Sequence, residues 1–163
     1  MGGALMPDHL SAIEDWAANL LGQLELRSRN ELVRTLGREI RRNQRHRIIA
    51  QRNPDGTQYA PRKKQHIRHK DGRVKRSVKM FQKLRAGKYL KVQGNGTLIS
   101  IGFTGRTARI AKVHQFGLRD STKQAGLKVG YERREILGIT DADIILIRNS
   151  LISHLLKSKP KNH

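Results

Sequence analysis

The sequence contains no cysteine, and this absence removes two kinds of chemistry from consideration. Neither a disulfide framework nor a thiolate reaction is available to the chain, which fits a protein that assembles in a reducing cytoplasm. Long hydrophobic runs are also missing, since no apolar stretch approaches the roughly 20 residues of a membrane-spanning helix. The N-terminal residues lack the basic and apolar regions of a secretory signal. We therefore expect a soluble protein that is not exported and contacts no membrane.

Acidic residues are scarce as well. The chain has 13 Asp or Glu against 34 Lys or Arg, which gives a formal net charge of +21 and a pI near 11.4. The excess is regional, because residues 1–26 carry four acidic residues and no Lys or Arg. Residues 27–91 carry 22 Lys or Arg against four acidic residues, a net charge of +18. This distribution favours an anionic partner for the middle of the chain.

Two helices are expected at the N-terminal end. Apolar residues at spacings of three and four predict an N-terminal helix within residues 1–27, with Asp8 as its N-cap. Ser28 stands three residues before Glu31, which is the capping-box spacing. A second helix is therefore expected over about residues 29–50, with one apolar face and one arginine-rich face.

The middle and the C-terminal end carry three further patterns. Apolar residues at helical spacing predict a short third helix of about ten residues that Gly87 ends. Residues 89–93 and 97–103 alternate between polar and apolar side chains on either side of Gly-Asn-Gly, which predicts a β-hairpin. Thr140 stands three residues before Asp143, so a capping box is expected to begin an apolar C-terminal helix.

The remaining segments read as loops. We expect a mobile basic loop over residues 62–79, a glycine-containing loop over 117–130 and a flexible tail over 157–163. The predicted fold is a single α+β domain over residues 1–163. Its small antiparallel sheet is built on the 89–103 hairpin with help from the segments that flank the second loop, and the C-terminal helix packs across that sheet.

Enzymatic chemistry finds little support. The carboxylates are scattered, and the capping role of Asp141 and Asp143 at a helix N-terminus explains their positions without catalysis. His66 and His69 are spaced as metal ligands can be, but they stand among Lys and Arg, which disfavours a bound cation. Neither a Gly-x-Ser-x-Gly nor a His-Glu-x-x-His motif is present. We therefore expect no catalytic activity, no metal and no cofactor.

Nucleic acid is a stronger alternative, because a basic surface can neutralise many phosphates. The candidate interaction residues are Arg38, Arg41, Arg42, Arg45, Arg62, Lys63, Lys64, Arg68, Lys70, Arg73, Lys75 and Arg76. Only seven aromatic residues occur in the chain, and none is interleaved with the basic residues of the 62–79 loop, which weakens a single-strand stacking model. No helix-turn-helix pattern is present. Nonspecific binding of phosphates remains open as a function.

The stretch IAKVHQFGLRD, residues 110–120, holds a lone histidine in an apolar setting. His114 has three readings, as a catalytic base, as a metal ligand or as a part of the framework. In such surroundings a histidine is more often a hydrogen-bonded structural residue, and we favour that reading. Phe116 and Gly117, which follow it, are a pattern that can end a helix or turn a strand.

Five blocks in a fixed order, NPDGTQYAP, KMFQKLR, IGFTGR, RIAKVHQFGL and YERREILGIT, precede an apolar C-terminal helix. This set resembles the virion morphogenesis, or tail completion, family of tailed bacteriophages, which includes contractile-tailed phages such as Mu and its relatives. The resemblance runs from about Leu32 to Leu156. It identifies the following framework residues within the blocks: Pro54, Gly56, Met80, Phe81, Leu84, His114, Phe116, Gly117, Leu137 and Gly138.

The resemblance implies a structural virion protein that acts in tail completion, tail termination or head-tail joining, without catalysis. It implies a homo-oligomeric ring, commonly of six copies, at the neck or tail end around the DNA channel. The implied partners are the tail tube, terminator or connector proteins, with nonspecific contact to DNA in the channel. The implied location is the virion, and the host cytoplasm during assembly. A nonspecific nucleic-acid-binding protein of the bacterial cytoplasm is the alternative.

Overall fold

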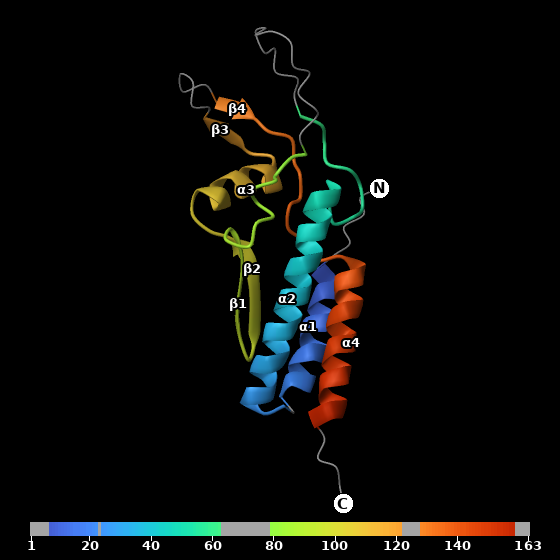
Figure 1. Cartoon of the computed structure of the whole chain (residues 1–163). Coiled ribbons are helices and arrows are strands. Elements are labelled where there is room, and N and C mark those ends of the chain that lie inside the picture. Colours follow the sequence, from blue (N-terminus) through green and yellow to red (C-terminus); the bar gives the residue numbers. More distant parts are fainter. Residues whose placement is uncertain (1–6, 23, 63–78, 122–127, 159–163) are drawn as a thin grey trace, which may run out of the picture. The chain divides into compact units, whose positions relative to one another are not determined.

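The computed structural model describes residues 7–22, 24–62, 79–121 and 128–158 of the chain (Figure 1). Four helices and four strands lie within these residues. They are α1 (Pro7–Leu21), α2 (Leu26–Ala50), β1 (Leu90–Asn95), β2 (Leu98–Phe103), α3 (Arg106–Phe116), β3 (Arg119–Ser121), β4 (Lys128–Gly130) and α4 (Asp141–Ser158). The α+β class is confirmed.

The chain divides into two compact units. The first unit consists of residues 1–43, 92–101 and 139–163, and the second unit of residues 44–91 and 102–138. Three of the boundaries fall inside elements, because α2 and both strands of the β1–β2 hairpin each begin in one unit and end in the other. Each unit has its own hydrophobic core.

The core of the first unit lies among helices. Leu24, Leu32 and Leu151 are buried together, so that α2 and α4 share one core. Side chains of α1 and α4 pack against these three, namely Trp16, Ala17, Leu21, Ile147 and Leu155. The two helices α1 and α4 lie side by side (Figure 1). The prediction that the C-terminal helix packs across the sheet is therefore corrected, because its apolar face is buried by α1 and α2 instead.

The two ends of α4 correspond to two predictions, the capping box at its start and the tail after its end. The backbone N–H of Thr140 donates to Asp143 Oδ2 at 3.1 Å, and the N–H of Asp143 donates to Thr140 Oγ1 at 3.1 Å, so the predicted capping box is confirmed. Asn43 of α2 also donates to Asp143, at 2.8 Å. At the other end α4 continues to Ser158, beyond the expected start of the tail, and residues 159–163 lie outside the described residues. The side chain of Asp8, the expected N-cap of α1, is also outside them.

The predicted hairpin is confirmed, with its turn placed slightly later in the chain. The pair β1–β2 is joined by two residues, Gly96 and Thr97, and only an antiparallel pair can be closed so tightly. Asn95 Oδ1 accepts hydrogen bonds from the N–H of Thr97 at 3.0 Å and of Leu98 at 3.1 Å, an Asx turn that fixes the reversal. In the first unit the hairpin approaches α2 closely, since a Cβ added to Gly94 would stand 2.6 Å from Val33 Cγ1.

The core of the second unit joins α2, the turns before β1, α3 and the segment after β4. Its buried members are Ile48, Leu84, Ala111 and Ile136, with Phe81 and Phe103 packed against them. The helix α3 was not predicted, because its two buried residues, Ala111 and Val113, stand two apart and leave no apolar stripe to recognise. Gly117 ends α3 in the left-handed conformation, at φ 64°.

The expected third helix before Gly87 is not formed. Residues 80–85 make a series of turns, in which the N–H of Leu84 donates to the carbonyl of Phe81 at 2.9 Å and the N–H of Ala86 to that of Lys83 at 3.1 Å. Phe81 has a φ of 62°, which a right-handed helix does not allow. The apolar residues whose spacing predicted a helix are therefore part of a tight turn.

The expected single sheet is two separate sheets. Strands β3 and β4 pair only with each other, from Arg119 opposite Gly130 to Ser121 opposite Lys128. They occupy both ends of the 117–130 segment that we expected as a loop, and residues 122–127 lie outside the described residues. The prediction of a mobile loop over 62–79 likewise falls mainly on residues 63–78, which the structure does not describe.

Candidate functional site

The second unit is built around an extended segment that no strand accompanies. We call residues 131–138 the docked segment, because side chains from elsewhere in the unit hold its backbone. The N–H of Arg134 donates to the carbonyl of His114 at 2.7 Å, and the N–H of Glu135 donates to Asn53 Oδ1 at 2.9 Å. Arg47 of α2 donates to the carbonyls of Glu135 at 2.9 Å and of Ile136 at 3.0 Å. Backbone groups without a sheet thus find partners in side chains.

Two glutamines bind the end of the docked segment in the same way. Gln115 of α3 donates to the carbonyl of Leu137 at 2.8 Å and accepts from its N–H at 2.9 Å. Gln44 of α2, which is buried, donates to the carbonyl of Gly138 at 2.8 Å and accepts from its N–H at 3.2 Å. Each amide side chain therefore closes a two-bond ring with one residue, which copies the pairing of an antiparallel strand.

Arg134 points back from the docked segment to the chain that leads into the basic loop. Its side chain is 4% exposed. Nε donates to the carbonyl of Ala60 at 2.7 Å, Nη2 to that of Pro61 at 2.8 Å and Nη1 to that of Glu132 at 3.2 Å. The guanidinium group thus holds the backbone at these three carbonyls in place, because their oxygens would lose this hydrogen-bond donor without it. Sequence reasoning missed Arg134, which stands beside the similar but exposed Arg133.

His114 lies beside this arginine within a group of rings. Its Nδ1 is 3.3 Å from Arg134 Nη1, and its ring meets those of Phe81 and Tyr131 edge to face at centroid distances of 4.8 and 5.0 Å. Burial lowers the pKa of His114 below its ordinary value of 6.5, and the charges of Arg134 and Arg62 lower it further. The ring of Tyr59 also meets that of Phe81 edge to face, at 5.6 Å, and burial raises the pKa of Tyr59 to about 12. These surroundings favour a neutral histidine held in place by packing.

The remaining framework residues lie at turns and contacts of the second unit. A Cβ added to Gly138 would overlap the ring of Pro54, so this glycine lets the docked segment pass close to the turn after α2. Gly56 adopts a φ of 85° within that turn. The N–H of Met80 donates to Gln51 Oε1 at 2.7 Å. Phe116 differs from the others, because its side chain is 61% exposed and packs against no core.

The candidate basic residues are only partly placed by the structure. Arg38, Arg42, Arg45 and Arg62 are exposed and Arg41 is half-buried. The other seven lie in the part of the chain that the structure does not describe. Arg42 forms an ion pair with Glu39. Sequence reasoning overlooked a further set of exposed basic residues in the second unit, on α3 and the strands after it: Arg106, Arg109, Lys112, Arg119 and Lys128.

The charge of the chain belongs almost wholly to one unit. Counted over the sequence, the second unit has 24 Lys or Arg against five Asp or Glu, a net charge of +19. The first unit has ten Lys or Arg against eight Asp or Glu, a net charge of +2. The docked segment, His114 and the exposed bases of α3 therefore share the polycationic unit. A polyanion is the ligand that such a surface attracts.

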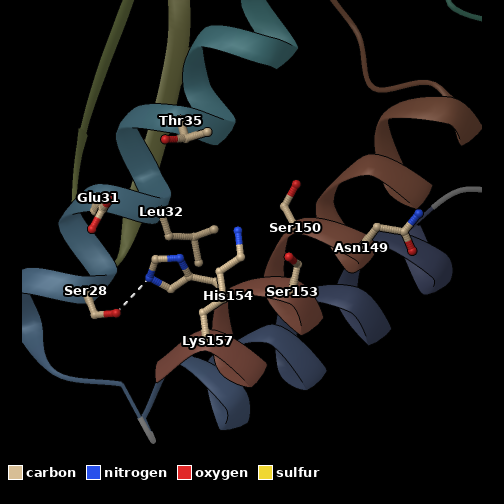
Figure 2. A pocket seen from close by; sticks show the side chains of 9 residues that line it. All are labelled: Ser28, Glu31, Leu32, Thr35, Asn149, Ser150, Ser153, His154 and Lys157. Atoms are coloured by element: carbon tan, nitrogen blue, oxygen red, sulfur yellow. Dashed lines mark hydrogen bonds between the residues drawn. The ribbon is translucent and has the colours of Figure 1, made fainter. Parts of the chain in front are cut away.

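The first unit holds a polar groove of about 600 Å³ between α2 and α4 (Figure 2). Its lining comes from the two helices: Ser28, Glu31, Leu32, Thr35, Asn149, Ser150, Ser153, His154 and Lys157. Ser28 Oγ lies 2.7 Å from His154 Nε2. The predicted capping box at Ser28 is therefore wrong, because α2 already begins at Leu26 and the hydroxyl is used to bind α4. Among the nine side chains drawn in Figure 2, the carboxylate is that of Glu31, which stands on α2 like Ser28.

Metal and membrane sites are not evident among the described residues. Within them, no three side chains of His, Asp or Glu are grouped so as to hold a metal ion. His66 and His69, the spaced pair weighed as ligands, lie outside that part of the chain. None of the helices that the structure describes combines the length and apolar character needed to cross a membrane.

The model of the phage virion morphogenesis family matches residues 8–156. The chain belongs to the phage virion morphogenesis family. Tail completion protein S of Escherichia phage P2 is 39% identical to it over 143 residues, which cover 87% of this chain and 94% of that protein. No solved structure matches the sequence significantly.

Membership in the phage virion morphogenesis family extends over both units. The matched range begins just inside α1 and ends just before the last residues of α4. The two cores, the β1–β2 hairpin and the docked segment all fall within it. The family match therefore applies to the whole fold rather than to one of its units.

Proposed function

We propose that this protein completes the tail of a tailed bacteriophage as a structural component of the virion. The observation that carries the proposal is the 39% identity to tail completion protein S of phage P2 over 94% of that protein's length. Because nearly the whole relative is covered, the similarity supports the same overall role rather than a shared module. Tail completion implies contact with other tail proteins and a place in the virion.

The role needs no catalysis, and we propose that the protein has none. The site that the structure describes supports this view, since three of its polar side chains are bound to backbone carbonyls and N–H groups. Gln44, Gln115 and Arg134 hold the docked segment in this manner. His114 is packed between rings. Groups used in this way fix a shape, and we assign the framework residues of the five blocks to that task.

We propose further that the protein forms a ring, of six copies, at the neck or tail end around the DNA channel. Its candidate partners there are the tail tube, terminator or connector proteins. The second unit, with a net charge of +19, then faces the phosphates of the channel DNA. Arg45, Arg62 and the exposed basic residues of α3 are the candidates for this surface among the described residues.

The acidic first helix is a candidate for the ring contact. Glu14 and Asp15 are exposed on α1, and residues 1–26 contain no Lys or Arg. Attraction between this helix and the basic unit of the next copy gives a head-to-tail contact, which closes into a ring if the rotation allows. Changing both residues to lysine should abolish rings seen by electron microscopy of the purified protein. Unchanged ring size in the double variant would rule this contact out.

The proposed function is tested in the phage itself. An early stop codon in the gene should give lysates in which filled heads lie beside unjoined tails or tails of abnormal length, and the intact gene supplied from a plasmid should restore infectious particles. Tail length separates a terminator from a joining factor. Normal infectious particles from the phage with the interrupted gene would contradict a role in the virion.

The exposed bases of the second unit support one competing function, nonspecific binding of nucleic acid in the bacterial cytoplasm. This alternative predicts that the protein is absent from purified virions and is found with host DNA or RNA. Detection of the protein in gradient-purified particles decides against it.

A further inference from the structure

One face of α4 is apolar and exposed although the helix is already packed on its other side. Ile145, Ile152 and Leu156 are 57%, 45% and 68% exposed, whereas Leu151 on the opposite face is 2% exposed. Three large aliphatic side chains in one row on the surface are unusual for a soluble protein, and such patches mark sites of contact. The row belongs wholly to the first unit.

The spacing of this face is that of a helix-pairing surface. Ala142, Ile145, Asn149, Ile152 and Leu156 follow one another at intervals of three, four, three and four residues, and all five are exposed. We call these five residues the α4 seam. An apolar repeat of this period lies along one stripe of a helix and meets the same stripe of a second helix. A single asparagine within such a stripe restricts the register of the pair.

We propose that the α4 seam binds the α4 seam of a second copy of this protein, with the two helices antiparallel. The inference stands apart from tail completion, because it rests on α4 alone. In the favoured register Ile145 of one copy lies opposite Leu156 of the other, and the two Ile152 side chains flank the two-fold axis. Every large apolar residue of the seam is then covered.

The charge distribution supports both a second copy as the partner and the antiparallel direction of the two helices. The first unit has a net charge of only +2, so two copies can approach through it, whereas two second units at +19 each repel one another. The first turn of α4 carries Asp141, and its last turn carries Lys157. Antiparallel pairing brings the acidic end of one helix to the basic end of the other, and opposes the two helix dipoles favourably.

The pairing is isologous, so two copies satisfy it completely. A head-to-tail ring has no two-fold axis between neighbouring copies, so the seam does not hold the proposed ring together and instead joins copies of two different rings. It is a different contact from the one through Glu14 and Asp15. The two can be tested separately.

The first experiment measures mass by sedimentation equilibrium of the full chain. Ile145→Asp and Ile152→Asp together should weaken self-association at least tenfold, because they place four carboxylates in the paired seam. Leu98→Asp is the matched control, since Leu98 is 62% exposed on the hairpin of the same unit but lies off the seam. Circular dichroism should show both variants folded. A wild-type protein that stays monomeric, or a seam variant that associates as strongly as the wild type, would overturn the proposal.

Cysteine crosslinking tests whether the two α4 helices are antiparallel. Because the native sequence contains no cysteine, only the introduced cysteines can form a disulfide. A disulfide requires the two Cα atoms to lie within about 7 Å. In the favoured register, residue 145 is separated from its own copy by roughly 16 Å along the helices, from the rise of about 1.5 Å per residue. Ile145→Cys alone should therefore not crosslink, but mixed with Leu156→Cys it should give a covalent heterodimer. Self-crosslinking of Ile145→Cys without the mixed product would contradict the antiparallel pairing.

Discussion

At the scale of single residues, the second unit is held together by side chains that replace a neighbouring strand. Beyond Tyr131, the docked segment pairs with no strand among the described residues, yet its backbone is bound by Gln44, Gln115 and Arg47. A buried amide or guanidinium can do this because it presents donors, and in glutamine also an acceptor, at the separation of a backbone N–H and carbonyl. Loss of one such side chain leaves buried backbone groups without partners, which costs more than the bond itself contributed.

Arg134→Lys tests this principle most directly. Lysine keeps the charge but has no Nε donor and no planar fork, so the carbonyls of Ala60 and Pro61 cannot both be satisfied. We expect the free energy of unfolding, measured in urea, to fall by roughly 1–3 kcal/mol. The neighbouring Arg133→Lys is the control, because Arg133 is exposed and its ion pair with Glu135 lies at the surface. Equal effects of the two changes would show that the carbonyl cage is not what stabilises this turn.

His114 gives the unit a pH dependence with a definite sign. Its pKa in the folded protein is lowered from the ordinary value of 6.5, so the unfolded chain binds the proton more tightly. Stability is therefore complete above about pH 6.5 and declines as the pH falls from there toward the lowered folded-state pKa. In His114→Gln the free energy of unfolding should be flatter between about pH 7 and pH 5, because the unfolded wild-type chain gains the proton of this histidine over that range. His46→Gln, at an exposed position of α2, should keep the wild-type slope, and a slope that survives in His114→Gln would refute the assignment.

At the scale of elements, the sequence predicted those whose apolar residues form a regular pattern. The stripes of α1, α2 and α4 and the alternation of the β1–β2 hairpin were all recognised, because the apolar residues of each element recur at a regular spacing. The helix α3 was missed because Ala111 and Val113 are its only buried residues. Basic residues interrupt the apolar pattern along the rest of the helix. The false helix before Gly87 had the right spacing, but Phe81 uses its positive φ to enter the ring cluster.

For the candidate site, the sequence supports predictions only about features that depend on residue type and local context, and not about contacts that the fold creates. His114 as a framework residue and the basic character of the middle segment were expected from composition and context. The role of Arg134 was not, because nothing local separates it from Arg133; only the fold brings the carbonyls of Ala60 and Pro61 to its side chain. The same holds for Ser28, whose partner His154 lies 126 positions away in the sequence.

The start of α4 offers a prediction at this scale. Asp143 is 1% exposed and accepts from Thr140 and from Asn43, so it both caps α4 and ties it to α2. Asp143→Ala should lower the free energy of unfolding by about 1–3 kcal/mol, from the loss of the cap and the unpaired Asn43 amide. Asp141→Ala, in the same turn but exposed, should cost only a few tenths of a kcal/mol through the helix dipole. Similar values for both would mean that the capping box contributes little.

At the scale of the whole molecule, the two units differ in net charge, and the two proposed tasks of the chain fall on different units. The first unit is nearly neutral and carries the α4 seam, whereas the second unit holds +19 of the +21 net charge. Self-association and attraction of a polyanion make opposite demands, because repulsion between like charges opposes the first and the same charge drives the second. If both proposals hold, copies gather through the first unit while the second unit stays available for DNA.

This separation predicts which arginines govern DNA binding. Binding of the full chain to duplex DNA should weaken as salt rises, with the same slope of log K against log salt for two unrelated sequences. Arg106→Ala with Lys112→Ala, both exposed on α3, should lower the magnitude of that slope by about 1.8, which is 0.9 for each lost phosphate contact. Arg27→Ala with Arg34→Ala removes the same charge from exposed positions of the first unit and should leave the slope unchanged. If both pairs reduced the slope equally, net charge alone would be responsible and the second unit would not be the surface that faces DNA.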